Sequence, residues 1–75
     1  MFPLAFVGEG KRVVLKYFVG GHGIFRKLVD MGLNPGSEIF VVRNQMAGPL
    51  IISVKGGQIA LGRGIAMKIY VEVKE

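Results

Sequence analysis

The spacing of glycine constrains this chain more than any other feature. Twelve of its 75 residues are glycine, and they divide the sequence into short segments. Glycine weakens the interior of helices and strands but suits turns, so these positions mark the ends of secondary-structure elements. A chain of 75 residues is also too short to close two cores. We therefore expect one domain, spanning residues 1–75, built from short elements joined by tight turns.

Between the glycines, apolar residues recur with a period of two, which is typical of half-buried strands. The last segment is the clearest case, because Ile69, Val71 and Val73 alternate with polar or aromatic neighbours. The pattern predicts strands over residues 12–18, 38–42, 50–55, 58–61 and 68–74, with a tight turn at Gly56-Gly57. Short strands joined in this way favour a mainly β fold, a small barrel of five to six antiparallel strands.

One segment departs from the period of two. From His22 to Met31, apolar residues recur at three- and four-residue spacings, which predicts a single short capping helix. Gly32 is placed as its left-handed stop, and Asn34-Pro35-Gly36-Ser37 reads as a type II turn. We expect positive φ at Gly32 and Gly36. The predicted core comprises Val13, Leu15, Leu28, Ile39, Val41, Ile52, Val54, Ile69 and Val71.

The composition excludes several classes of function. There is no cysteine, hence no disulfide and no thiol nucleophile or ligand, which favours a reducing, cytoplasmic compartment. The N-terminal segment lacks the basic start of a signal peptide, and no apolar run is long enough to insert into a membrane. Ten basic residues against five acidic ones give a net charge of +5, but they are dispersed. A solvated surface, a nucleic-acid patch and an acidic protein partner all remain open.

Catalytic residues are scarce. His22 is the only histidine, and the acidic residues are scattered along the chain. No Ser/His/Asp arrangement indicates a nucleophile, and Gly20-Gly21-His22-Gly23 lacks the pattern of a phosphate-binding loop. We therefore expect no enzyme activity, no catalytic residue, no cofactor and no dedicated metal site, although whether any metal binds is left open.

A protein of this kind must work through its surface. The candidate partner-binding residues are Phe25, Arg26, Lys27, Met31 and Leu33 around the helix, together with Met46 in a loop between two strands. An apolar centre with an arginine-containing rim is the usual build of a protein-binding patch. The alternative is that Phe25, Met31 and Leu33 all belong to the core. In that case the contact surface lies elsewhere, around Met46 or Phe40.

Three motifs, taken in order, resemble the ferrous iron transport protein A (FeoA) family over nearly the whole chain. The first is the run from Arg26 to Ile39, with its Met-Gly-Leu and Pro-Gly steps. The second is the Gly-Pro-Leu strand that begins at Gly48, and the third is the closing segment from Gln58 to Val71. One departure concerns Gly62-Arg63-Gly64-Ile65, where the family usually has a basic pair opening a short helix. We expect that helix to be frayed here.

The resemblance implies an SH3-like barrel in the cytoplasm that binds and modulates a membrane ferrous iron transporter, ferrous iron transport protein B (FeoB). It implies a protein–protein interaction with the cytoplasmic part of that transporter. No nucleic acid is expected as a partner and self-association is left open. The alternative, argued from charge and fold alone, is a small basic barrel that binds nucleic acid.

Overall fold

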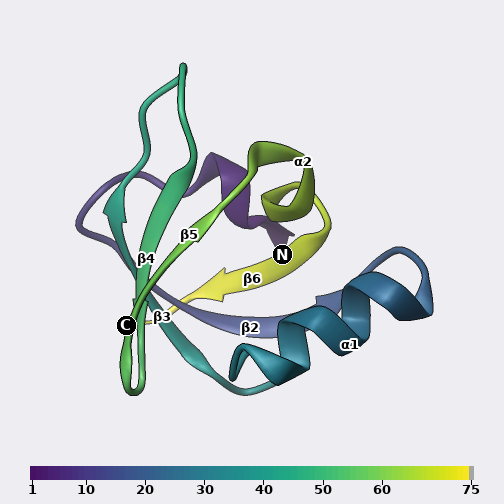
Figure 1. The fold of residues 1–75 in the computed structure, drawn as a ribbon. Helices are drawn as coiled ribbons and strands as arrows, with labels where there is room; N and C mark the ends of the chain where they lie inside the picture. Colours follow the sequence, from purple (N-terminus) through teal and green to yellow (C-terminus); the bar gives the residue numbers. More distant parts are fainter. Residues whose placement is uncertain (75) are drawn as a thin grey trace.

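The computed structural model describes residues 1–74, which form one six-stranded antiparallel sheet that curls around the core (Figure 1). In chain order the elements are β1 (Phe2–Pro3), the 3-10 helix η1 (Leu4–Phe6), β2 (Arg12–Phe18), α1 (His22–Asp30), β3 (Glu38–Arg43), β4 (Leu50–Val54), β5 (Gly57–Leu61), α2 (Arg63–Ala66) and β6 (Ile69–Val73). The five strands predicted from the sequence are all present, each within one residue of its expected bounds. Among the described residues, no helix has the length and apolar character that crossing a bilayer requires.

The strands follow the order β1-β6-β2-β3-β4-β5, so β1 and β5 lie at the two ends of the sheet. Two register shifts interrupt the pairing. One falls between Leu15 and Tyr17 on β2, and the other between Val41 and Arg43 on β3. An extra residue on one strand bends that strand and increases its twist. These two irregularities therefore help a sheet of such short strands to curl around a small core.

The core is entirely apolar among the described residues. Eight of the nine predicted members are buried, and Val54 alone is half-buried because it lies at the end of β4 beside the hairpin turn. The sequence pattern did not identify the remaining buried residues, which come largely from loops, short helices and strand ends: Leu4, Ala5, Val7, Leu33, Leu50, Leu61 and Ala66.

Helix α1 ends in a Schellman motif. The Leu33 N–H donates to the Leu28 carbonyl at 2.9 Å, and the Gly32 N–H donates to the Val29 carbonyl, also at 2.9 Å. Gly32 has φ +89°, a conformation that costs a glycine little. Leu28 and Leu33, which such a motif brings together, are both buried. The predicted helix stop is confirmed.

The predicted type II turn follows at once. The Ser37 N–H donates to the Asn34 carbonyl at 2.8 Å, and Gly36 has φ +95°. The turn is also joined to β2, because the Gly36 N–H donates to the Leu15 carbonyl at 2.7 Å. Helix α1 is thereby held against the sheet at both its last turn and the loop that follows.

Two expectations about the C-terminal half were wrong. The β4–β5 hairpin turns at Lys55 and Gly56 rather than at Gly56-Gly57, because Val54 already pairs with Gly57. The short helix α2 is formed, and the Ala66 N–H donates to the Gly62 carbonyl at 3.0 Å. Burial of Ala66 in the core fixes this turn in spite of its glycines.

We predict that replacing either Gly32 or Gly36 by alanine destabilises the protein by about 1 kcal/mol or more, because alanine is strained at positive φ. Gly23 is the matched control. It lies inside α1, has no positive φ, and an added methyl group there would meet nothing within 4 Å. Gly23→Ala should raise stability by about 0.5 kcal/mol. Urea unfolding measures all three, and equal effects at the three positions would contradict the turn geometry.

Candidate functional site

An aromatic hollow lies where β2 leads into α1. The Phe25 side chain is 47% exposed, and its ring meets that of Phe18 edge to face, with ring centroids 5.3 Å apart. The hollow has a volume of about 290 Å³, and its lining consists of Phe18, Val19, Gly20, Gly21, His22 and Phe25. The hollow is largely apolar, as the centre of a protein-binding patch usually is.

Two basic residues follow Phe25 on α1, but neither of them lines the hollow. Arg26 and Lys27 are both exposed, and among residues 1–74 neither forms an ion pair. Met31 is half-buried and packs against the core. Leu33, however, is 0% exposed, so its assignment as a partner contact was wrong. As the residue after the Schellman glycine, it is drawn into the core by the way the helix ends.

Met46 belongs to a different part of the molecule. Its side chain is 95% exposed in the β3–β4 loop, which projects at the top of Figure 1, whereas α1 lies at the lower right. The six candidate residues therefore do not form one patch. Phe25, Arg26 and Lys27 are exposed on α1, where consecutive residues point in different directions. Met31 is half-buried just after the helix, and Met46 lies in a separate loop.

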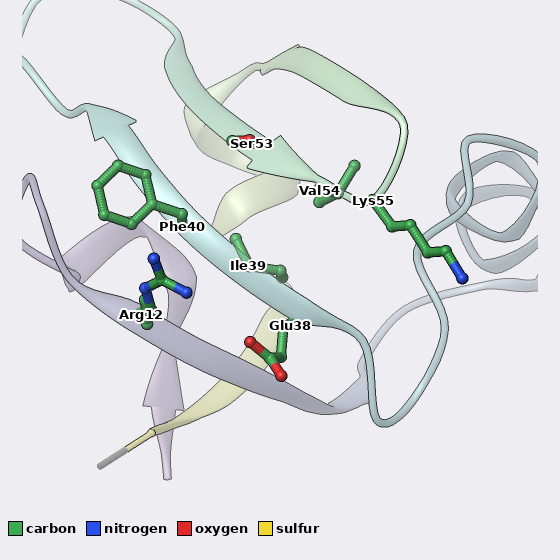
Figure 2. A pocket seen from close by; sticks show the side chains of 7 residues that line it. All are labelled: Arg12, Glu38, Ile39, Phe40, Ser53, Val54 and Lys55. Carbon is green, nitrogen blue, oxygen red and sulfur yellow. The ribbon is translucent and has the colours of Figure 1, made fainter.

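A second hollow lies on the outer face of the sheet, between β2, β3 and the end of β4 (Figure 2). It has a volume of about 280 Å³, and its charged lining residues are Arg12, Glu38 and Lys55. The Arg12 guanidinium lies 5.7 Å from the centroid of the Phe40 ring, a cation–π distance. Phe40 is thereby half-buried on the outer face. The hollow mixes both signs of charge around Ser53.

Among residues 1–74, no group of three or more His, Cys, Asp or Glu side chains is placed to hold a metal ion. His22 is exposed at the first position of α1, and Gly21, which precedes it, provides no side-chain cap.

Comparison with known proteins identifies the family of this chain. The sequence matches the family described as FeoA domain over residues 2–73. The chain belongs to the FeoA family. It is 55% identical over 75 residues to a Methanocaldococcus jannaschii protein described as "Putative Fe(2+) transport protein A", an alignment that covers all of this chain and 90% of that protein. Proteins of this family are non-enzymatic accessory proteins of transport.

Solved structures of FeoA proteins share the fold. The crystal structure of an iron uptake regulatory protein, FeoA, is similar at a TM-score of 0.90 and 40% identity, covering 96% of each chain. The Stenotrophomonas maltophilia FeoA complexed with zinc, described as a procaryotic SH3 domain protein, is similar at a TM-score of 0.82. Its identity is 21%, and 96% of this chain and 91% of that chain are covered. The SH3-like fold expected from the FeoA motifs is therefore confirmed.

A polar network that sequence reasoning missed connects three distant segments of this FeoA domain. The Asn44 side-chain amide donates to the Ala5 carbonyl at 3.0 Å and to the Val7 carbonyl at 2.6 Å. The Arg63 guanidinium donates to Asn44 Oδ1 and to the Gln45 carbonyl. Arg63 lies at the first position of α2. Its one guanidinium joins α2 to the β3–β4 loop.

The nucleic-acid alternative gains little from the geometry. Tyr17 and Tyr70 lie opposite each other on β2 and β6, and their rings stack in parallel with centroids 4.9 Å apart. One face of each ring is therefore covered by the other ring and is not free to stack on a nucleic-acid base. The neighbouring Lys16 ammonium lies 3.2 Å from a Glu72 carboxylate oxygen, so a carboxylate already faces it. A basic and aromatic stripe free for nucleic acid is not assembled there.

We predict that the pKa of Glu38 lies below its usual range. The Lys74 ammonium donates a hydrogen bond to this carboxylate and attracts its charge, and Arg12 adds a weaker attraction against a small desolvation effect. A lowered folded-state pKa stabilises the protein above the unfolded-state pKa, and that contribution is lost as the pH falls through the folded value. Carboxyl NMR should show the shift, and Lys74→Met should move the pKa back up. An unchanged pKa in that variant would contradict the pairing.

Proposed function

We propose that this protein is a cytoplasmic accessory of ferrous iron uptake that binds the cytoplasmic part of a membrane ferrous iron transporter of the FeoB type and modulates it. The family supports the transport system as its setting. The observation that carries the binding mode is the surface of α1, which presents a half-exposed Phe25 ring and two exposed basic side chains, Arg26 and Lys27. Neither basic side chain forms an ion pair within residues 1–74.

Physical reasoning favours the surface of α1 over the outer face of the sheet as the interface. An aromatic ring in a hollow gives a partner apolar area to bury at its centre, and Arg26 supplies the residue type most often found at energetic hot spots. On the outer sheet face, Lys16 and Lys74 are already paired with Glu72 and Glu38. The charges on α1 remain available to an acidic partner. Self-association through the same face stays a separate possibility that gel filtration can measure.

We predict that Arg26→Glu combined with Lys27→Glu weakens binding to the detergent-solubilised transporter by about tenfold or more. The double substitution replaces two positive charges on α1, which would attract an acidic partner, by two negative charges that repel it. Lys27 lies in the last turn of α1, so reversal costs up to about 1 kcal/mol per charge and leaves the fold intact. Lys11→Glu with Lys55→Glu is the matched control, with the same change of net charge at exposed residues outside α1.

The measurement is surface-based or microscale binding to the purified transporter, with circular dichroism as the check on folding. Phe25→Ser tests the apolar centre independently of charge and should weaken binding by a similar factor. If both α1 variants bind as the wild type does, this face is not the interface. If the wild type does not bind the transporter but retards single-stranded nucleic acid at moderate salt, the proposed function is wrong.

We predict that the isolated protein binds ferrous iron weakly or not at all. The described residues lack a cluster of metal-ligating side chains, and a single exposed imidazole is a poor site by itself. Anaerobic calorimetry is the measurement. Stoichiometric binding at micromolar affinity would overturn the prediction, and loss of that binding in His22→Ala would then locate the site.

A further inference from the structure

Three exposed apolar side chains from separate parts of the chain meet at the end of the barrel away from α1. Phe6 of η1 is 68% exposed, Met46 of the β3–β4 loop is 95% exposed, and Met67, just after α2, is 41% exposed. Together with Ala5, Asn44 and Arg63 they line one hollow with a volume of about 380 Å³. That volume lies within the range of roughly 300–1,000 Å³ that is usual for ligand pockets.

The hollow is held open by polar contacts rather than by its apolar walls. Asn44 connects the base of the β3–β4 loop to the carbonyls of Ala5 and Val7, and its own N–H donates to a Glu9 carboxylate oxygen at 2.8 Å. Arg63 then connects α2 to the same loop. The segments that carry Phe6, Met46 and Met67 are thus fixed relative to one another before anything binds. Such preorganisation lowers the entropy that binding costs.

Arg63 also brings an unmatched charge to this hollow. A guanidinium has five N–H donors, and in Arg63 one terminal nitrogen makes both of the hydrogen bonds to Asn44 and Gln45. Its Nε is buried and has no hydrogen-bond partner within residues 1–74. The ion pairs of the described residues involve Lys16 and Lys74, so no carboxylate among residues 1–74 is paired with the Arg63 guanidinium. The buried Nε is closed to a ligand, but the other terminal nitrogen also has no hydrogen-bond partner within residues 1–74. A carboxylate is the acceptor that suits a guanidinium best.

We propose that this hollow is a second docking site, which takes an acidic, apolar peptide segment of a partner protein. One large apolar side chain of the segment enters between Phe6, Met46 and Met67. A carboxylate next to it in the segment accepts hydrogen bonds from Arg63. Methionine-lined surfaces adapt readily to different apolar side chains, so the site recognises this combination rather than one strict sequence. This proposal does not rest on the function proposed for α1.

Other occupants fit less well. A nucleic acid or an anionic membrane would require several cations, and the lining of the hollow contains only Arg63. A second copy of the chain would bring its own net charge of +5. A second copy could offer its exposed apolar residue Val73, which lies next to the carboxylate of Glu72. That carboxylate is already paired with Lys16, and the neighbouring Lys74 is paired with Glu38. Charge complementarity therefore favours an acidic partner.

The test uses three synthetic peptides with capped ends. The probe is Gly-Ser-Glu-Leu-Phe-Glu-Ser-Gly, the second peptide has glutamine in place of both glutamates, and the third has alanine in place of leucine and phenylalanine. Fluorescence anisotropy gives the affinities, and nitrogen-15 NMR follows the Arg63 Nε–H signal. We expect the probe to bind with a Kd on the order of 1 mM or tighter and to shift that signal. Each of the other two peptides should bind about tenfold more weakly.

Variants separate the contributions of the site. Met46→Ser should weaken probe binding about fivefold without affecting the fold, because this side chain is almost fully exposed. Val73→Thr is the matched control, since it alters an exposed apolar residue outside the hollow and should change nothing. Arg63→Gln should abolish the difference between the acidic and the glutamine peptide. Should that variant loosen the loop, Arg63→Lys, which keeps the charge, must retain a preference for the acidic peptide.

The same experiments can overturn the proposal. Equal affinity for the acidic and the glutamine peptide would do so, as would probe-induced shifts confined to α1, or no binding at several times the expected Kd. Dimerisation without peptide that produces the same NMR shifts would show that the occupant is a second copy. The Arg26→Glu, Lys27→Glu variant should bind the probe as the wild type does, so failure of the α1 interface and failure of this site are distinguishable.

Discussion

The pair of backbone hydrogen bonds between Leu15 and the loop after α1 is the contact on which the arrangement of this molecule depends. The Gly36 N–H donates to the Leu15 carbonyl, and the Leu15 N–H donates to the Ser37 carbonyl at 2.9 Å. They extend the β2–β3 pairing beyond its last register pair, Val14 with Glu38. Because a type II turn and a Schellman motif follow α1 without a gap, fixing this loop also fixes the helix. The exposed face of α1 is therefore positioned by backbone geometry.

Local signals made most of this fold predictable. A period of two identified the strands, the three- and four-residue spacing identified α1, and Gly32 and Gly36 have the positive φ that their places in a stop and a turn require. Each of these depends on residues within a few positions of one another. Predictions failed where tertiary context decided the outcome. Leu33 is buried by the way its helix ends, and α2 forms because Ala66 packs in the core.

The candidate site was predicted less completely, for a physical reason. Phe25, Arg26 and Lys27 could be placed on one helix from their spacing alone, but their exposure depends on what covers the helix. The Asn44 network joins residues 18 to 39 positions apart through side-chain contacts. Nothing in the local pattern around Asn44 or Arg63 indicates that they meet.

A domain of this size has to function through its surface, and its two apolar hollows lie on different parts of the barrel. The sheet between them is short-stranded, with an apolar and close-packed core, so it has little capacity to change shape when one hollow is filled. Communication between the hollows by a conformational change is therefore disfavoured. Two weak docking sites on a rigid body instead reinforce each other through effective concentration when both of their segments belong to one partner or one assembly. The distance between the two hollows, rather than the binding affinity of either one, therefore determines which partner geometries the domain can bridge.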